Sequence, residues 1–290
     1  MSWRIVVISS SAKLDYQMGF LVVRRDSVVK IHLSEIYTLI IESTAVSLTT
    51  ALLSELMKRK TKVIFCDEKR NPSSEMISYY GSHDTSMKIR NQIKWEDEIK
   101  AEVWTEIVRE KIKKQSEHLQ IYDFKAAEML NAYISQIEFG DSTNREGHAA
   151  KVYFNALFGL DFTRTEDNSI NAALNYGYSI LLSAFNREIT ANGYITQLGL
   201  FHDNMFNYFN LSSDLMEPFR PIVDYQVKTM NPVKFEKEEK MMILQILQKE
   251  VRIAEKKELL SNAIKIYSKS IFDAINNRDI SLIRFYYNEL

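Results

Sequence analysis

Residues 87–119 have the sequence MKIRNQIKWEDEIKAEVWTEIVREKIKKQSEHL, and this stretch decides the fold of most of the chain. Its apolar and charged positions alternate at spacings of three and four, as they do on one long surface helix or on two shorter ones. The pattern stays helical from about residue 86 almost to the end of the chain. Further helices are predicted at residues 125–138 and 168–188, and a solvated helical hairpin at residues 236–287. The larger part of the chain is therefore predicted to be all-α.

The first seventy residues show a different pattern. Short segments rich in Val and Ile, separated by polar turns, indicate strands of an antiparallel sheet. Helical spacing begins at Ser47 and continues to Lys60, because apolar positions recur there every three or four residues. The predicted strands of this part span residues 4–9, 19–25, 28–33, 38–42 and 62–68.

A polar stretch that contains Pro72 follows these strands and is predicted to be a linker. We therefore expect an α+β protein of more than one domain. Its parts are a small β-rich N-terminal domain over residues 1–70, a linker over residues 71–85, and a larger α-helical domain over residues 86–290.

The composition is that of an ordinary soluble globular protein, with 46% apolar and 26% charged residues in a chain of 290. The formal net charge is −1, so any contact with nucleic acid must come from a local basic surface. The single cysteine, Cys66, lies in the apolar run KVIFC and is predicted to be a buried thiol. Neither a secretory signal nor a membrane-spanning apolar run is present in the sequence, so we expect a cytoplasmic protein without membrane contact.

Residues 200–221, LFHDNMFNYFNLSSDLMEPFRP, have the composition of a metal site. His202 is followed by Asp214 and Glu217, which are three residues apart and therefore share one face of any helix that holds both. The same spacing before an apolar run is also that of a helix capping box, in which both carboxylates serve only backbone N–H groups. The spacing alone favours capping and leaves metal binding open.

A second acidic candidate lies in residues 143–159, TNREGHAAKVYFNALFG. Thr143 or Asn144 can cap a helix whose first turn contains Glu146. Alanines three and four residues later leave room above this carboxylate for whatever docks there. Glu146 can equally be a first-turn glutamate that complements the helix dipole, and the spacing alone favours that interpretation.

Four separated motifs resemble those of the CRISPR adaptation integrase, the metal-dependent enzyme family that inserts new spacers into CRISPR arrays. In chain order they are NREGHAAKVYFNALFG, SINAALNYGYSILLSAFNREITANGY, LGLFH and SSDLMEPFRPIVD. The N-terminal segments IHLSEIYTLIIE and KVIFCDEKRNP also resemble the β-domain of this family, so the resemblance covers about residues 1–230. Agreement of four motifs in order and spacing is specific, although any one of them alone would be weak.

The resemblance implies a catalytic metal site in the helical domain. In the family one divalent metal is bound by a glutamate, a histidine and a further acidic residue, and these match Glu146, His202 and Glu217. Asp214 is then expected to cap a helix or to support the ligands from behind. Two carboxylates and one imidazole suit Mg²⁺ or Mn²⁺, which would activate a 3′-hydroxyl and stabilise the charge on the scissile phosphate.

The resemblance also implies partners. We expect a homodimer that associates through the β-rich domain, bound to double-stranded prespacer and CRISPR-repeat DNA and to the second small CRISPR adaptation protein. The motifs look most like those of the branch that accompanies type II systems, which adds a large effector nuclease and an accessory ring-shaped protein. Residues near the ligand motifs are expected to contact DNA, and they are Arg145, Asn175, Tyr176, Arg187 and Arg220.

Two other functions stay open from the sequence. The first is a plain metal-dependent DNA nuclease, because the same metal can activate water instead of a DNA hydroxyl. The second is a non-enzymatic, helical DNA-binding scaffold, in which Glu146, His202 and Glu217 are capping or core residues. The sequence does not distinguish them from an integrase.

Overall fold

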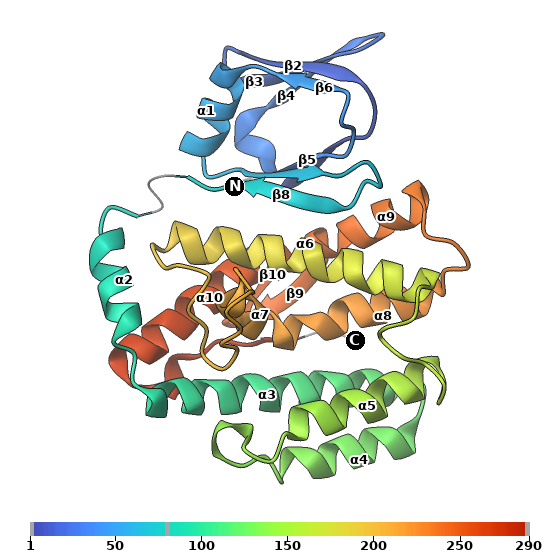
Figure 1. Cartoon of the computed structure of the whole chain (residues 1–290), viewed down its shortest axis with the longest axis vertical. Helices are drawn as coiled ribbons and strands as arrows, with labels where there is room; N and C mark the ends of the chain where they lie inside the picture. Colours follow the sequence, from blue (N-terminus) through green and yellow to red (C-terminus); the bar gives the residue numbers. More distant parts are fainter. Residues whose placement is uncertain (1–2, 79–81, 288–290) are drawn as a thin grey trace. The chain divides into compact units, whose positions relative to one another are not determined.

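The computed structural model describes residues 3–78 and 82–287. The chain divides into two compact units (Figure 1). The first unit comprises Met1–Thr85 with Thr190–Gly193, and the second comprises Ser86–Ile189 with Tyr194–Leu290. Within the described residues, no helix has the length and apolar character needed to cross a membrane.

The first unit contains two four-stranded sheets. One sheet has the order β1-β5-β7-β8, formed by Arg4–Ile8, Ile36–Ile41, Lys62–Cys66 and Pro72–Met76. The other has the order β4-β3-β2-β6, formed by Val28–His32, Phe20–Arg24, Ala12–Gln17 and Val46–Leu48. The predicted strands exist, but the prediction of one antiparallel sheet is wrong, because β1, β5 and β7 run parallel. All six residues of β5 are buried, which is typical of parallel strands covered on both faces.

One helix accompanies these sheets. Helix α1, Thr50–Lys58, begins after Thr49, whose hydroxyl accepts a hydrogen bond from the N–H of Leu52. Cys66 is buried, as predicted. The core of the unit is formed by apolar side chains from both sheets and from α1, among them Leu14, Leu21, Leu39, Leu52 and Val63.

The predicted linker contains structure. Strand β8 pairs antiparallel with β7, and a buried Lys62 ammonium lies 2.5 Å from the Glu75 carboxylate of β8. The turn between the strands is closed by Asp67, which accepts the N–H of Asn71 at 2.8 Å. Residues 79–81 of the predicted linker lie outside the described residues.

The second unit is mainly helical. Its helices are α2 (Thr85–Ile93), α3 (Asp97–Leu119), α4 (Phe124–Ile134), α5 (Arg145–Phe158), α6 (Ser169–Ala191), α7 (Asn210–Leu215), α8 (Arg220–Met230), α9 (Lys237–Leu244) and α10 (Leu260–Asn277), with short 3-10 turns that include η3 (Glu217–Phe219). Helix α3 packs against α4, α5, η3 and α8, so it is in contact with most of the elements that carry the candidate residues.

Helices α6 and α8 approach each other closely at Gly177. A Cβ atom at Gly177 would lie 2.4 Å from Cγ1 of Val223, so only glycine allows this approach. The neighbouring Tyr178 is thereby brought to the side chain of Asp224 on α8.

The prediction of an entirely helical second part is wrong at its C-terminal end. Strands β9 (Glu250–Ile253), β10 (Lys256–Leu259) and β11 (Tyr286–Tyr287) form an antiparallel sheet in the order β10-β9-β11. Helix α10 is not solvated but buries one face, including Ile264, Tyr267 and Ile271. The segment therefore consists of helix α9, a small three-stranded sheet and the core helix α10 rather than a solvated helical pair.

Candidate functional site

Glu146 lies in the first turn of α5, as predicted. The N-terminus of this helix is capped by Asn144, which accepts the N–H of Gly147 at 3.2 Å. Buried Asp141 accepts the N–H groups of Arg145 at 2.8 Å and Glu146 at 3.0 Å. Since other side chains serve these backbone donors, the Glu146 carboxylate is available for other contacts.

Glu217 begins the 3-10 turn η3, between α7 and α8, and its side chain is only 5% exposed. Its carboxylate forms ion pairs with the Nζ of Lys111 at 2.5 Å and with the Nε of Arg220 at 2.9 Å. Burial raises the pKa of Glu217, but the positive charges of Arg220 and Lys111 outweigh burial and hold it below its ordinary value.

Lys111 of α3 joins the two carboxylates. Its ammonium group forms ion pairs with both Glu146 and Glu217, and its side chain is 7% exposed. Burial lowers the pKa of Lys111, but the two carboxylates outweigh burial and raise it, so Lys111 is charged at neutral pH. Lys111 was not singled out from the sequence. A signal existed, since Lys111 lies in the apolar stripe of α3 beside Ile107 and Val108.

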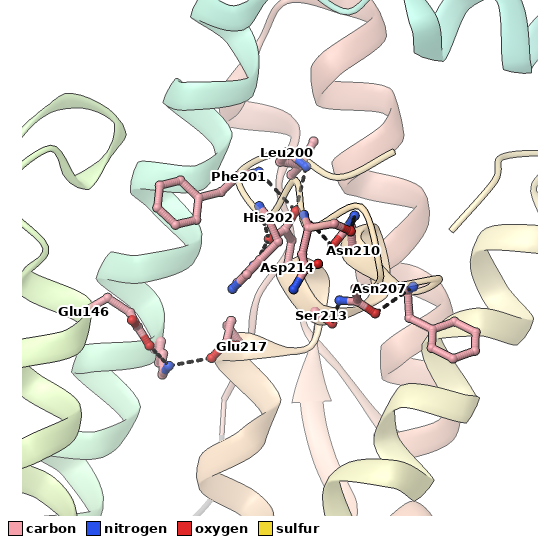
Figure 2. A network of polar contacts seen from close by, with 12 residues as sticks. Glu146, Leu200, Phe201, His202, Asn207, Asn210, Ser213, Asp214 and Glu217 are labelled. Carbon is pink, nitrogen blue, oxygen red and sulfur yellow. Dashed lines mark hydrogen bonds and ion pairs between the residues drawn. The ribbon is translucent and has the colours of Figure 1, made fainter. Parts of the chain in front are cut away.

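His202 lies on the loop before α7, and Asp214 of α7 organises this loop (Figure 2). The fully buried carboxylate of Asp214 accepts the backbone N–H groups of Leu200 at 2.6 Å, Phe201 at 3.1 Å and His202 at 3.2 Å. It also accepts Nδ1–H of the His202 ring at 2.5 Å. This hydrogen bond raises the pKa of His202 and leaves Nε2 with a lone pair in the neutral ring, the arrangement typical of metal-binding histidines.

Of the two roles expected for Asp214, the helix cap is wrong and the support of His202 is the one that the structure shows. Asp214 lies inside α7, and no side chain caps η3. Its carboxylate instead binds the N–H groups of a loop 12 to 14 residues earlier in the chain. Asp214 therefore supports His202 from behind.

Phe201 and His202 rest against a single residue of α3. The Trp104 indole stacks on the Phe201 ring with centroids 4.5 Å apart. It meets the His202 ring edge-on at 5.8 Å. The loop is thus held by Asp214 on one side and by Trp104 on the other.

The three predicted metal ligands are brought into one region but not to a common point. Glu146 and Glu217 share the Lys111 ammonium, and His202 lies near enough to Glu217 to lower its pKa. Across residues 3–78 and 82–287, no three His, Cys, Asp or Glu side chains lie close enough together to hold one metal ion. That these three side chains share a metal stays a prediction.

The carboxylate pair opens into a cavity of about 280 Å³. Three cations and three carboxylates line it, and they are Lys111, Arg164, Arg220, Glu146, Glu217 and Asp224. Tyr178 also lines the cavity, and the centroid of its ring lies 4.7 Å from the Arg220 guanidinium and 5.4 Å from that of Arg164. The cavity can therefore accept an anion beside a cation-binding carboxylate pair.

Asp224 also lines the cavity and is 1% exposed. The sequence did not single it out. Its carboxylate accepts a hydrogen bond from the hydroxyl of Tyr178. Burial raises the pKa of Asp224 to about 6, although Tyr178 and Arg220 act against this rise.

The arginines that were expected to contact DNA differ in their surroundings. Arg220 lines the cavity and pairs with Glu217. Arg187 is paired with the adjacent Glu188 and is 16% exposed. The guanidinium of Arg145 lies 5.6 Å from a tyrosine ring of α4. Arg220 is therefore the arginine of this group that lies at the candidate site.

Tyr176 was expected to contact DNA, but its surroundings contradict this. Its side chain is 3% exposed and packs against Phe235 with ring centroids 5.6 Å apart, so it has no face to offer to a phosphate. Asn175 is exposed, but its amide oxygen accepts a hydrogen bond from Arg164 at 2.7 Å. Arg164, which reaches the cavity from the loop before α6, was not expected.

Known proteins are similar to this chain in sequence. Residues 5–255 match the family model described as CRISPR associated protein Cas1. The chain is 36% identical over 229 residues to the CRISPR-associated endonuclease Cas1 of Neisseria meningitidis serogroup C, covering 78% of this chain and 75% of that protein. It is 26% identical over 238 residues to CRISPR-associated endonuclease Cas1 1 of Francisella tularensis subsp. novicida, covering 74% of each.

Solved structures share the fold. A casposase bound to integration product superposes with a TM-score of 0.76 at 17% identity, covering 96% of this chain and 92% of that one. A Cas1 protein from Thermotoga maritima gives a TM-score of 0.75 at 16% identity, covering 94% and 97%. A chain of a Cas6-RT-Cas1–Cas2 complex gives 0.74 at 18% identity, covering 99% of this chain and 36% of that one. Together with the family match over residues 5–255, the four motifs, the two-part fold and the paired carboxylates show that the chain belongs to the Cas1 family of CRISPR-associated proteins.

Proposed function

We propose that the chain is a divalent-metal-dependent DNA integrase of CRISPR adaptation, which joins the 3′-hydroxyl ends of a prespacer duplex to the CRISPR repeat. Its relatives are named as endonucleases, and the casposase of similar fold is bound to an integration product. The observation that carries the proposal is the convergence of Glu146 and Glu217 on one cation. Beside this pair, His202 offers a free Nε2.

The donor set fits Mg²⁺ or Mn²⁺. Two carboxylates from different elements already share a cation, and the tautomer of His202 is set by Asp214. Carboxylate-rich sites with one imidazole suit these ions. Glu146, Glu217 and His202 would hold the metal, which would lower the pKa of the attacking hydroxyl and neutralise charge on the phosphate.

The proposed reaction exchanges one phosphodiester for another. The 3′-oxygen of the prespacer bonds to a phosphorus of the repeat strand while the bond from that phosphorus to its own 3′-oxygen breaks. The attacking hydroxyl loses its proton to water, and the departing 3′-oxygen gains one. Arg220 and Arg164 line the cavity and provide guanidinium donors for the phosphate oxygens.

The proposed partners follow from the need for two insertions. The proposal gives one chain one metal site, formed by Glu146, His202 and Glu217, so joining both prespacer ends requires a homodimer or a larger assembly. A Cas1–Cas2 complex is among the structures of similar fold, which supports a heterocomplex with the second small adaptation protein. We further propose that a type II effector nuclease and an accessory ring-shaped protein are partners. The proposed location is the cytoplasm.

A joining assay tests this function. The purified protein and its Cas2 partner are incubated with a labelled 3′-hydroxyl duplex, a supercoiled plasmid carrying the repeat, and Mn²⁺. We expect joined product, and a loss of about 100-fold or more for Glu217→Gln or His202→Ala. Glu98→Gln, at an exposed position of α3, is the control and should join normally.

The other outcomes identify the alternatives. Strand cleavage without joining would identify a plain metal nuclease. The absence of any Mn²⁺-dependent product, with no effect of His202→Ala on DNA binding, would identify a helical DNA-binding scaffold.

A further inference from the structure

We propose that Lys111 is a tethered cation that holds the Glu146–Glu217 pair together in the metal-free protein, and that a divalent metal must displace its ammonium group in order to bind. The displaced ammonium group moves one turn along α3 to Gln115. This proposal rests on the proposed metal site. It gives the Lys111 side chain two positions, one in the metal-free protein and one in the metal-bound protein.

The first state is the one in the structure. Glu146 of α5 and Glu217 of η3 are far apart in the sequence, yet their carboxylates are directed toward each other (Figure 2) and both contact Nζ of Lys111. Glu217 is 5% exposed and Lys111 is 7% exposed. Glu146 is 28% exposed. Two carboxylates brought together at such a largely buried position repel each other unless a cation lies between them. Lys111 therefore does in the metal-free protein what the metal would do when bound.

Charge balance makes the two cations competitors. Lys111 and Arg220 together neutralise Glu146 and Glu217. A divalent ion that is added while Lys111 stays in place puts two cations against the same pair of carboxylates, and their mutual repulsion costs free energy. Both cations also use the same carboxylate oxygens. Withdrawal of the ammonium group relieves the competition for these oxygens.

The second position is provided by Gln115. It lies four residues after Lys111 on α3, so the two side chains share one face of the helix, and both line the 280 Å³ cavity. Gln115 is 1% exposed, and its buried Oε1 accepts no hydrogen bond from the described residues. A buried acceptor without a donor is costly. An ammonium group displaced into the cavity supplies that donor.

Asp224 favours the same displacement. Asp224 and Gln115 line the same cavity, and the Asp224 carboxylate is attracted by the charge of Lys111. The flexible four-carbon stem of lysine allows the ammonium group to move without movement of α3. The cavity therefore offers the displaced charge both a hydrogen-bond acceptor and a carboxylate.

Mn²⁺ binding to the full chain without DNA tests the proposal. Free Mn²⁺ is measured by electron paramagnetic resonance for wild type, Lys111→Met and the control Lys100→Met, whose lysine pairs with exposed Asp97 at the start of α3. We expect Lys111→Met to bind Mn²⁺ about tenfold more tightly or better, because the competing cation is gone. Lys100→Met should match wild type.

A second variant keeps the test decisive if Lys111→Met folds poorly. Gln115→Leu removes the second position and leaves the resting ion pairs intact, so Mn²⁺ affinity should fall by about three- to tenfold. Its metal-free melting temperature should be unchanged or higher, because an acceptor without a donor is replaced by an apolar side chain.

The outcomes separate the two proposals. Equal Mn²⁺ affinity in wild type, Lys111→Met and Gln115→Leu overturns the displacement and leaves the integrase function standing. Weaker binding by Lys111→Met also overturns it. No Mn²⁺ binding by wild type or by either variant overturns both this proposal and the proposed function. Binding by Lys111→Met alone supports displacement in its strongest form.

Discussion

The Nδ1 atom of His202 lies 2.5 Å from Oδ1 of Asp214, a carboxylate with no solvent exposure. A carboxylate can only accept this hydrogen bond, so Nδ1 carries the proton and the lone pair of the neutral ring is on Nε2. The same carboxylate accepts three consecutive backbone N–H groups of the loop. One buried side chain therefore sets the path of the loop and the orientation of its histidine.

Replacement of Asp214 by alanine should unfold this arrangement. Three buried N–H groups would lose their acceptor, so we expect a loss of about 3 kcal/mol in the free energy of unfolding in urea. Mn²⁺-dependent joining should fall by roughly 10- to 100-fold. The control is Asp203→Asn, at an exposed position of the same loop. An Asp214→Ala variant whose unfolding midpoint lies at the same urea concentration as that of wild type would contradict this role.

Gly199→Ala should damage the same loop by steric conflict. A Cβ atom at Gly199 would lie 2.3 Å from the backbone oxygen of His202 and 2.7 Å from Oδ2 of Asp214. The loop must shift, so we expect weaker Mn²⁺ binding together with a stability loss of roughly 1–3 kcal/mol. Leu198→Ala, at an exposed neighbouring position, should change neither quantity. Wild-type Mn²⁺ affinity in Gly199→Ala would show that the loop adapts.

His118 should make the fold sensitive to acid. Its ring is buried beside the Tyr153 hydroxyl at 2.5 Å, and burial, with the charges of Lys228 and Lys249, lowers its pKa from 6.5 to about 4. Between these values the unfolded chain binds more protons than the folded one, so stability falls as pH falls.

The expected loss from His118 is about 3 kcal/mol between pH 6.5 and pH 4. Urea unfolding across this range should show the loss in wild type and a smaller one in His118→Gln. Parallel pH dependences of the two proteins would exclude the histidine as the cause.

Asp224 should act in the opposite direction. Burial raises its pKa from 3.8 to about 6, so the folded protein binds more protons in this interval and stability falls as pH rises through it. Asp224→Asn should therefore be more stable than wild type at about pH 7.5, by up to about 3 kcal/mol, with the difference shrinking toward pH 4. Asp161→Asn, at an exposed position, serves as the control. A variant less stable than wild type at both pH values would contradict this balance.

Local signals made parts of the fold predictable. Helix α5 begins where Asn144 and the acidic first turn indicate, and strands β1, β3, β4, β5 and β7 lie where segments rich in Val and Ile predict them. Strands β2, β6 and β8 were not predicted. The hairpin of β9 and β10 was missed because its turn residues, Ala254 and Glu255, have φ values of 48° and 62°. Turns with positive φ are usually formed by glycine or asparagine, and neither is present here.

The site was predictable only where a motif named its residues. Motifs named Glu146, Glu217 and His202, and the structure brings the two carboxylates to one cation. That these residues bind a metal stays a prediction. Lys111 was treated as one more charged residue on a surface helix, although its place in the apolar stripe of α3 indicated burial. Its two carboxylate partners could not be predicted, because they lie on other elements that only the tertiary fold brings near. Asp214 was expected either to cap a helix or to support the ligands from behind. The sequence could not decide between these roles, because the partners of Asp214 belong to a loop that only the tertiary fold brings near.

Helix α3 holds both halves of the site, since Trp104 supports the histidine loop and Lys111 binds the carboxylates. They are two helical turns apart, a rise of about 10 Å. The number of residues between Trp104 and Lys111 sets how the two side chains are oriented relative to each other on the helix. One residue inserted into this interval would turn Lys111 by about 100° relative to Trp104 and would misalign the imidazole with the carboxylates even if every side chain were kept. The length of this interval is thus more constrained than the identity of the partly exposed Glu106 and Arg109 within it.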